Sequence, residues 1–342
     1  MNEETKERLI EVLSIQSVSY NQELMFDYIV SKVKDYQYYI DEGNIYVTKG
    51  IADIYPCVVS HMDTVHDIVE DLIVLEFNGN LTGFNRVQME QTGIGGDDKV
   101  GIFIALECLE RFDNIKLAFF RDEEVGCIGS YVCDTDFFTD CSFILQCDRR
   151  GNSDFVTNAS GVQLSGKDFQ DDIKEILDSY GYKFANGMMT DVMAIKENGV
   201  KCAMANMSCG YYNPHTAQEF VNTDDVMYCL YMVEQIIYSL GDKQYLCEYV
   251  PKPKYVAPKY TSPKYTNYAV KSIHQPKLDN WSDRGWDSYY DWDYKKEEKY
   301  LDCEDCGKPC EKEELTYLHE YNAAVCKSCH DSFENAKYNE LW

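Results

Sequence analysis

Histidine and acidic residues recur along the first 220 residues, in loops or just after short apolar runs. His61 and Asp63 follow the apolar segment 56–60, and Glu123 follows the segment 115–122. The full set is His61, Asp63, Asp97, Asp98, Glu123, Glu124, Asp148 and His215. Imidazole and carboxylate groups can bind divalent metals or transfer protons. Singly, each has an ordinary explanation, because a loop histidine usually faces water and two aspartates at a helix start can act as a cap.

Their combination points to a metal centre. Three or four carboxylates gathered in one crevice repel one another unless cations hold them there. Imidazole and carboxylate ligands together suit zinc, or related metals such as cobalt or manganese. Two ions about 3.5–4 Å apart need one bridging carboxylate and two terminal ligands each. Two histidines and the available carboxylates satisfy this requirement and leave one carboxylate as a base.

The elements that must position these residues alternate along residues 1–245. Helical spacing of apolar residues occurs in segments 4–15, 21–36, 99–112, 171–182, 190–199 and 224–240. Short apolar runs at 56–60, 115–122, 142–148 and 201–208 are typical of strands that are covered on both faces. Residues 36–49 read as a hairpin. The alternation predicts an α/β three-layer sandwich with a mixed, mostly parallel sheet, whose strands end at a ligand crevice.

Five short motifs, taken in order, make the chain resemble a known protein family. "HMDT", "GGDDKVG", "RDEEVG", "CDRRG" and "NPHTAQEF" follow one another between His61 and His215. They resemble the ordered motifs of the dinuclear zinc exopeptidases, the superfamily of peptidase T, aminoacylase and succinyl-diaminopimelate desuccinylase. The resemblance implies a phosphorylase/hydrolase-like fold and a hydrolase that cleaves an amide bond, of the aminopeptidase, dipeptidase or deacylase type. Its substrate would be a small peptide or an N-acyl amino acid.

The resemblance also implies a role for each residue. Asp97 bridges two divalent ions, and it is preferred to Asp98 because the family pattern is Asp-x-Lys. The other metal ligands it implies are His61 with Asp148 on one ion and Glu124 with His215 on the other. Asp63 orients His61, and Glu123 is the general base that activates a metal-bound water. His66 falls outside the family spacing, so we interpret it as a structural or surface residue.

One departure from the family concerns its inserted lid domain. Only about 65 residues separate Asp148 from His215, and the core itself needs them, so we expect neither the lid nor the dimer that it mediates. The lid histidine that stabilises the tetrahedral intermediate would then be missing. Tyr211, Tyr212 or Asn213 could supply that hydrogen bond instead. Arg149 and Arg150 could bind a substrate carboxylate or, alternatively, neutralise the acidic site.

Net charge, apolar runs and cysteine content indicate which binding partners and which cellular compartment to expect. The formal net charge of −27 argues against non-specific nucleic-acid binding, because phosphates would be repelled. No apolar run is long enough for a membrane span, and the charged start does not look like a secretory signal. Ten cysteines from Cys57 to Cys247 lie in largely apolar segments. These are expected to be small buried residues in a reducing compartment, which predicts a cytoplasmic protein.

The C-terminal third has a different composition. Residues 246–300 contain three Pro-Lys-Tyr repeats and then an aromatic, acidic segment, which predicts a tether, or else a strip that binds an acidic surface. Residues 301–342 contain two Cys-x2-Cys pairs, which predict a structural zinc site. Its four ligands would be Cys303, Cys306, Cys326 and Cys329, with Cys310 and His330 as possible substitutes. This module could simply be a stapled mini-domain, or it could dock a protein partner.

Two functions remain after the sequence analysis. The first is the metallohydrolase, favoured by the full set of ligands together with Glu123. The second is a non-catalytic or weakly active metal-binding scaffold that recruits a partner through its zinc module. The expected absence of the lid and the elaborate C-terminal third favour this second function, whereas a scaffold alone would not need Glu123.

Overall fold

The computed structural model describes residues 1–250 and, beyond them, residues 300–302, 309–311, 315–318, 323–327 and 330. The chain forms two compact units, Met1–Pro258 and Lys259–Trp342. Most of the predicted tether lies outside the described residues, as do Cys303, Cys306 and Cys329 of the predicted zinc site.

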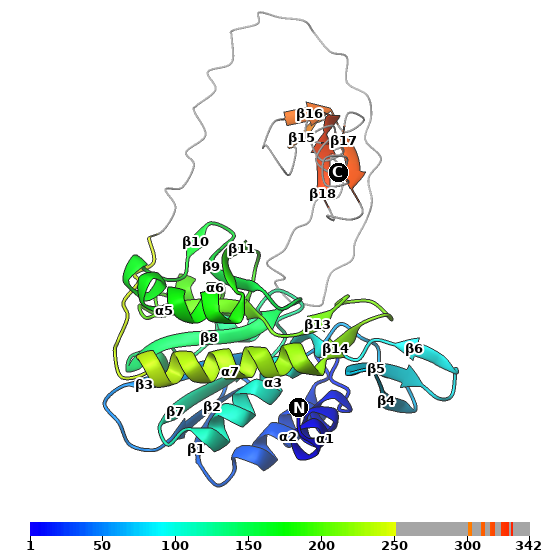
Figure 1. Cartoon of the computed structure of the whole chain (residues 1–342), viewed down its shortest axis with the longest axis horizontal. Coiled ribbons are helices and arrows are strands. Elements are labelled where there is room, and N and C mark those ends of the chain that lie inside the picture. Colours follow the sequence, from blue (N-terminus) through cyan, green and yellow to red (C-terminus); the bar gives the residue numbers. More distant parts are fainter. Residues whose placement is uncertain (251–299, 303–308, 312–314, 319–322, 328–329, 331–342) are drawn as a thin grey trace, which may run out of the picture. The chain divides into compact units, whose positions relative to one another are not determined.

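The first unit is built on a nine-stranded mixed sheet (Figure 1). Its strands are β1 (Gln37–Asp41), β2 (Asn44–Lys49), β3 (Tyr55–His61), β7 (Ile115–Phe120), β8 (Cys141–Arg149), β9 (Asp154–Ala159), β10 (Val162–Gln163), β11 (Lys183–Gly187) and β12 (Ala203–Ser208). The order is β1-β2-β7-β3-β8-β12-β9-β10, with β11 paired to β9. The central strands β7, β3, β8 and β12 are parallel, so their carboxyl ends meet at one edge of the sheet.

Helices cover both faces of this sheet. One face packs against α1 (Glu3–Leu13), α2 (Glu23–Val33), α3 (Gly96–Arg111), α5 (Lys167–Tyr180) and α7 (Thr223–Leu240). The other face packs against α6 (Asp191–Glu197) and the 3₁₀ turn η1 (Thr135–Phe138), and α4 (Ile128–Tyr131) lies against α6. Successive strand residues alternate between the two cores: Val58 belongs to the first, and Cys57 and Val59 to the second. The predicted three-layer α/β sandwich is therefore confirmed.

A second, five-stranded sheet was not predicted. It contains β4 (Leu72–Phe77), β5 (Asn80–Asn85), β6 (Glu90–Thr92), β13 (Tyr211–Tyr212) and β14 (Phe220–Asn222). The order is β13-β14-β5-β4, with β6 also paired to β5. Figure 1 shows β4, β5 and β6 at one end of the first unit. The sheet joins two segments far apart in sequence, and His215 lies in the connection between β13 and β14.

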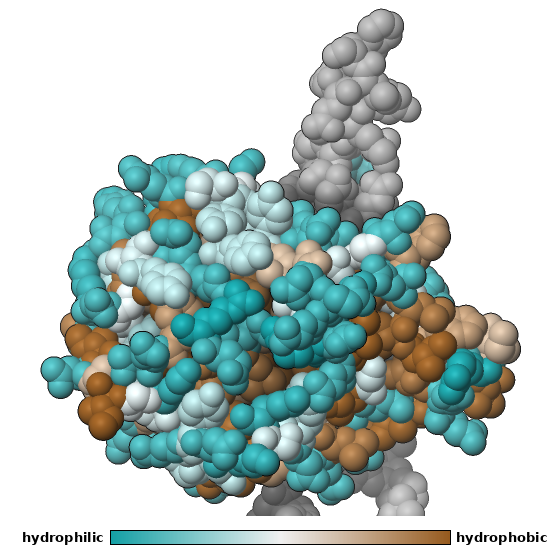
Figure 2. Space-filling view, turned by 60° about the horizontal axis from the view of Figure 1, so that its bottom comes forward, coloured by the Kyte–Doolittle hydropathy of each residue, from teal (hydrophilic) through white to brown (hydrophobic). Residues whose placement is uncertain are grey.

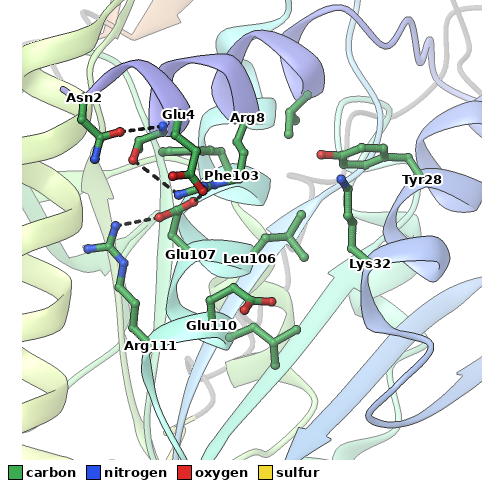
Figure 3. Close-up of a pocket in the computed structure, with 13 residues that line it drawn as sticks. Asn2, Glu4, Arg8, Tyr28, Lys32, Phe103, Leu106, Glu107, Glu110 and Arg111 are labelled. Atoms are coloured by element: carbon green, nitrogen blue, oxygen red, sulfur yellow. Dashed lines mark hydrogen bonds and ion pairs between the residues drawn. The ribbon is translucent and has the colours of Figure 1, made fainter.

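A cavity of about 530 Å³ lies among α1, α2 and α3 (Figure 3). Its charged groups are largely paired with one another: the buried Glu107 carboxylate of α3 accepts hydrogen bonds from Arg8 of α1 and from Arg111, both at 2.6 Å. Lys32 of α2 pairs with Glu11 at 3.1 Å. These contacts fasten α1 and α2 to the rest of the helical layer, and they leave little unpaired charge for a ligand.

Two sequence predictions concern cysteine and membrane association. The ten cysteines from Cys57 to Cys247 are buried and free, as predicted. Among the described residues, no helix combines the length and the apolar character needed to cross a bilayer.

Two short antiparallel strand pairs lie among the described residues of the second unit. Strand β15 (Tyr300–Asp302) pairs with β16 (Pro309–Glu311), and β17 (Leu315–Leu318) pairs with β18 (Ala323–Cys326). Cys326, one of the predicted zinc ligands, ends β18 and is buried.

The parallel centre of the sheet gives a stability prediction. Leu145 of β8 is fully buried, so Leu145→Ala should lower the free energy of unfolding by about 2–5 kcal/mol through lost burial and a residual cavity. Ile51, which is 97% exposed, provides the control. Ile51→Ala should change the free energy of unfolding by less than about 0.5 kcal/mol. Urea denaturation of both variants measures the difference, and equal effects would contradict the assigned core.

Candidate metal centre

The candidate residues meet at the carboxyl edge of the parallel strands. His61 is the last residue of β3, Asp148 lies near the end of β8, and Glu123 and Glu124 follow β7. Because β7, β3 and β8 are neighbours, these side chains come from adjacent strand ends. Asp97 comes from the start of α3 and His215 from the β13–β14 connection.

Five of the side chains form two groups that share Asp97. In the first group, His61 Nε2 lies 3.2 Å from Asp97 Oδ1 and 3.7 Å from Asp148 Oδ1. In the second, His215 Nε2 lies 3.4 Å from Asp97 Oδ2 and 3.1 Å from Glu124 Oε2. Within each group the potential ligand atoms all lie within 4.8 Å of one another. Asp97 thus presents one oxygen to each group.

Asp98, the neighbour of Asp97, has a different environment. Its Oδ2 accepts hydrogen bonds from Ser60 Oγ at 2.6 Å and from the His61 backbone N–H at 3.2 Å. Its Oδ1 accepts one from the Gly101 N–H in the first turn of α3. Asp98 therefore fastens the end of β3 to α3 and lies in neither donor group.

Glu123 lies beside the first group without belonging to it. Its Oε2 is 3.9 Å from His61 Nε2, and its Oε1 accepts a hydrogen bond from Cys127 Sγ at 3.4 Å. Burial raises the pKa of Glu123 well above its usual value, and repulsion from Asp148 and Asp191 adds to this effect.

Asp63 is fully buried and organises the ends of two strands. Its carboxylate accepts hydrogen bonds from the backbone N–H groups of Glu123 at 2.9 Å and Glu124 at 3.3 Å, and from Ser19 Oγ at 2.7 Å. Toward His61 Nδ1 it presents its backbone carbonyl at 2.9 Å and its carboxylate at 3.4 Å. Asp63 therefore fixes the His61 ring and the Glu123–Glu124 backbone together.

The carboxylates favour positive charge on both imidazoles. Burial opposes that charge on His61, but Asp148, Asp63 and Asp97 together raise the pKa of the ring well above its usual value. Asp97 and Glu124 raise the pKa of His215 to about 10. Burial raises the pKa of Asp148, and repulsion from Asp97 adds to it. The cluster therefore attracts cations, and a metal that binds the imidazoles would displace their protons.

The residues present fit a pair of divalent ions. Each group contains one imidazole and two carboxylates, which is the donor set that zinc, cobalt and manganese accept. The Glu124 Oε1 atom is buried and has no hydrogen-bond partner, so it is an uncompensated acceptor beside the second group. A cation there would satisfy it.

Sequence reasoning assigned no role to Glu219, which positions Asp97. Its carboxylate is fully buried and accepts hydrogen bonds from the backbone N–H groups of Gly95 at 2.6 Å and Asp97 at 3.2 Å. It also contacts His66 Nε2 at 2.7 Å, which is a structural contact of the kind expected for His66. Glu219 lies four residues after His215 in the same motif, and that proximity was the available signal.

Gln146 is a second residue without a predicted role. Its Nε2 donates to Asp148 Oδ2 at 3.2 Å and to Asp191 Oδ2 at 3.0 Å, while its Oε1 accepts from Thr190 Oγ1 at 2.8 Å. Gln146 precedes Asp148 by two residues on β8, so strand periodicity places both on one face. That periodicity could have indicated its role.

The candidate substrate-binding residues separate into two sets. The buried Tyr211 hydroxyl donates to Asp148 Oδ1 at 3.2 Å, so Tyr211 belongs to the centre. Tyr212 instead donates to Asp225 at 2.6 Å, and Asn213 donates to the Gln218 carbonyl at 3.4 Å. Arg149 pairs with Asp154 at 2.8 Å, whereas Arg150 is exposed.

This fold and this centre define a class: α/β sandwiches with an imidazole–carboxylate cluster at the carboxyl edge of a parallel sheet. No family model and no curated protein sequence matches the chain. Solved peptidase structures share the fold. The aminopeptidase PepT from Bacillus cereus aligns with a TM-score of 0.56 and 13% identity, covering 71% of this chain and 99% of that chain. A tripeptidase from Staphylococcus aureus aligns at 0.58 and 14%, covering 71% and 100%.

A third solved structure comes from an archaeon. The aminopeptidase from Desulfurococcus kamchatkensis aligns with a TM-score of 0.56 and 14% identity, covering 68% of this chain and 94% of that chain. At such identities, these likenesses show a common fold.

The contacts of Glu219 give a prediction for metal binding. Glu219→Gln removes the charge that holds the Gly95 and Asp97 N–H groups, so Asp97 should lose its fixed orientation. We expect divalent-metal affinity to fall about 10–100-fold, the usual loss when a ligand loses its supporting partner.

Competition with a chelating indicator measures that affinity. Glu248→Gln is the control. The Glu248 side chain is 73% exposed, so this substitution should leave metal affinity unchanged. A folded Glu219→Gln protein with unchanged affinity would show that Glu219 does not position a ligand.

Proposed function

We propose that the chain is a metal-dependent hydrolase that cleaves an amide or peptide bond of a small substrate, of the aminopeptidase, dipeptidase or deacylase type. The observation that carries this proposal is the pair of donor groups that share Asp97, with Glu123 beside them and in neither. The peptidase fold supports the choice of bond, because solved neighbours include two aminopeptidases and a tripeptidase.

In this proposal, His61, Asp97 and Asp148 would hold one divalent ion, and Asp97, Glu124 and His215 would hold a second. The bound ions, zinc or else cobalt or manganese, would polarise the attacking water and the scissile carbonyl. The Glu123 carboxylate would act as the general base, taking a proton from the attacking water and passing it to the leaving amine. Asp63 fixes the His61 ring and the Glu123 backbone relative to one another. Tyr211 positions the Asp148 carboxylate through a hydrogen bond.

Substrate recognition is assigned to the rim of the centre. Arg150 is exposed and directly follows the end of β8, so it is the better candidate for binding a substrate carboxylate. Arg149 is already paired with Asp154. The substrate class that fits this assignment is a small peptide or an N-acyl amino acid with a free carboxylate.

Glu123→Gln tests the catalytic assignment. The amide cannot accept the proton, so turnover should fall by about 10²–10⁴-fold if general-base catalysis is its sole role. Metal content should stay at the parent level because Glu123 lies outside both donor groups. Glu124→Gln is the contrasting variant and should lose metal as well as activity.

Turnover on a panel of dipeptides, tripeptides and N-acyl amino acids, together with elemental analysis, measures both effects. A parent protein that contains no divalent metal in this centre would refute the hydrolase proposal. Unchanged turnover in a folded, metal-loaded Glu123→Gln protein would instead remove Glu123 from the mechanism.

Removing the C-terminal unit distinguishes the hydrolase function from the scaffold function. We assign its structural zinc to Cys303, Cys306, Cys326 and Cys329, and its role to recruitment of a partner. A chain that ends at Pro258 retains Tyr245 and Cys247, whose backbones bond to Ser142 and Lys201. It should therefore keep most of the hydrolytic activity of the full chain. Loss of activity without unfolding would mean that the C-terminal unit takes part in hydrolysis.

A further inference from the structure

Another surface cavity of the first unit lies beside the end of β7. Its volume is about 560 Å³, and it is lined by the start of α2, the loop before α2, the β1–β2 turn, Arg121 and Asp122. Asp122 directly precedes Glu123, so this cavity borders the candidate metal centre. The residues that line it have no role in the site as described so far.

The loop that carries Tyr20 is fastened to the centre. The backbone N–H of Tyr20 donates to the buried Asp122 carboxylate at 2.7 Å, and Gln22 Nε2 donates to the same oxygen at 2.9 Å. Ser19 Oγ donates to Asp63 at 2.7 Å. The loop is therefore fixed to the same carboxylate that orients the first donor group.

Tyr20 itself is exposed, although its backbone is strained. Its φ is +63°, a value that bulky residues rarely adopt. The Asn21 N–H donates to the Val18 carbonyl at 2.8 Å, so Tyr20 occupies the third position of a four-residue turn, where positive φ favours glycine or asparagine. Because Tyr20 is 72% exposed, packing within the first unit does not account for the tyrosine. Strain that is held in place beside a candidate active site points to a function for the side chain.

The cavity has an excess of negative charge. Arg121 pairs with Asp122 at 2.8 Å, so these two charges offset one another. Glu23 and Asp27, four residues apart on α2, line the cavity and are exposed, and the ion pairs of the described residues include neither of them. The Gln22 Oε1 atom is buried and has no hydrogen-bond partner in the described part of the chain. Two unpaired carboxylates and an unsatisfied acceptor suit a cationic ligand that donates hydrogen bonds.

The surroundings favour the same kind of ligand. The first unit presents a largely hydrophilic face in Figure 2, and hydrophobic residues gather at the end where β4–β6 lie. The chain has 59 acidic residues against 32 lysines and arginines, so its surface potential attracts cations. The rings of Tyr20 and Phe26 line the cavity and offer aromatic surface to a cation and to an aliphatic chain. A lysine or arginine side chain combines these two parts.

We propose that this cavity binds the basic side chain of a lysine or arginine at the amino end of a peptide substrate. The ammonium or guanidinium group pairs with Glu23 and Asp27 and donates to Gln22 Oε1, while the aliphatic stem lies against Tyr20 and Phe26. The proposal rests on the hydrolase function proposed above and deepens it by naming the substrate class.

The order of the strands gives the orientation of the substrate. Strands β7 and β8 flank β3, so the cavity after β7 and Arg150 after β8 lie on opposite sides of the end of β3. Alternate strands are about 10 Å apart, which an extended peptide spans with about three residues. A peptide whose carboxylate contacts Arg150 therefore directs its amino end toward the cavity. This orientation favours aminopeptidase action on short peptides over removal of an acyl group.

Steady-state hydrolysis of matched tripeptides tests the proposal. Norleucine has the aliphatic stem of lysine without the charge, so lysyl-alanyl-alanine should exceed both norleucyl-alanyl-alanine and alanyl-alanyl-lysine in kcat/KM by about 10-fold, the effect of two partly exposed ion pairs. The double variant Glu23→Gln, Asp27→Asn should lose this preference, because kcat/KM falls for the lysyl peptide and stays unchanged for the norleucyl peptide.

Two further variants sharpen the test. Asp168→Asn, Glu175→Gln is the matched control, because it removes the same number of charges from exposed positions on α5 and should keep the preference. Tyr20→Gly removes the ring and relaxes the backbone, since glycine adopts positive φ freely. It should lower kcat/KM for the lysyl and the norleucyl peptide alike, because the ring contacts the stem that they share, without lowering the thermal midpoint of unfolding.

Equal hydrolysis of the lysyl and norleucyl peptides by the parent would overturn the proposal, as would a double variant that keeps the preference. A parent that hydrolyses none of the peptides would refute the hydrolase function, and calorimetric titration with the same tripeptides then tests the cavity alone. The lysyl peptide should bind the parent about 10-fold more tightly than the norleucyl peptide, and the double variant should abolish this difference. Equal binding of the two peptides to the parent would refute the cavity as a site for basic side chains.

Discussion

The repulsion among carboxylates around Asp97 constrains the rest of this structure. Asp97, Glu123, Glu124 and Asp148 bring negative charge into a cleft where their side chains are at most 14% exposed. Like charges in such surroundings cost far more than in water, because the local dielectric constant is low. The two imidazoles offset part of that cost when they are protonated, and divalent cations would offset it more completely. A fold that tolerates this cluster has to hold each group in place against its neighbours.

Buried acceptors outside the donor groups provide that support. Asp63 binds the backbone of Glu123 and Glu124, and Glu219 binds the backbone of Gly95 and Asp97. Both are themselves carboxylates, yet they accept backbone N–H bonds, which stabilise a buried negative charge. The segments that carry the donor groups are thereby fixed at the backbone, so only the side-chain torsions are left to set the positions of the donor atoms. This arrangement also explains why acidic residues are so dense near the centre although Asp63 and Glu219 belong to neither donor group.

The sequence predicted the layered sheet well because its central strands are continuous apolar runs and its helices carry apolar residues at helical spacing. It also indicated that His61, Glu123 and Asp148 would come together, since residues after parallel strands meet at one edge. The choice of Asp97 over Asp98 rested on a family pattern, because two adjacent aspartates are indistinguishable by periodicity. The second sheet escaped prediction because β6, β13 and β14 are too short to show a pattern, and because β14 pairs with β5 from a distant part of the chain. The positions of Tyr211 and Tyr212 on opposite faces depend on that same pairing.

The two donor groups differ in their exposure to solvent, and this difference indicates from which side a molecule enters the cleft. The side chain of His61 is 1% exposed, whereas that of His215 is 51% exposed. His61 is enclosed by three neighbouring strand ends, while His215 stands on a turn of the smaller sheet. The 66 residues between Asp148 and His215 form β9–β12, α5, α6 and β13, so they are used by the two sheets and the helical layers. A molecule entering from solvent therefore meets the side of the cleft that carries His215 and Glu124 first, and the group around His61 and Asp148 lies behind it.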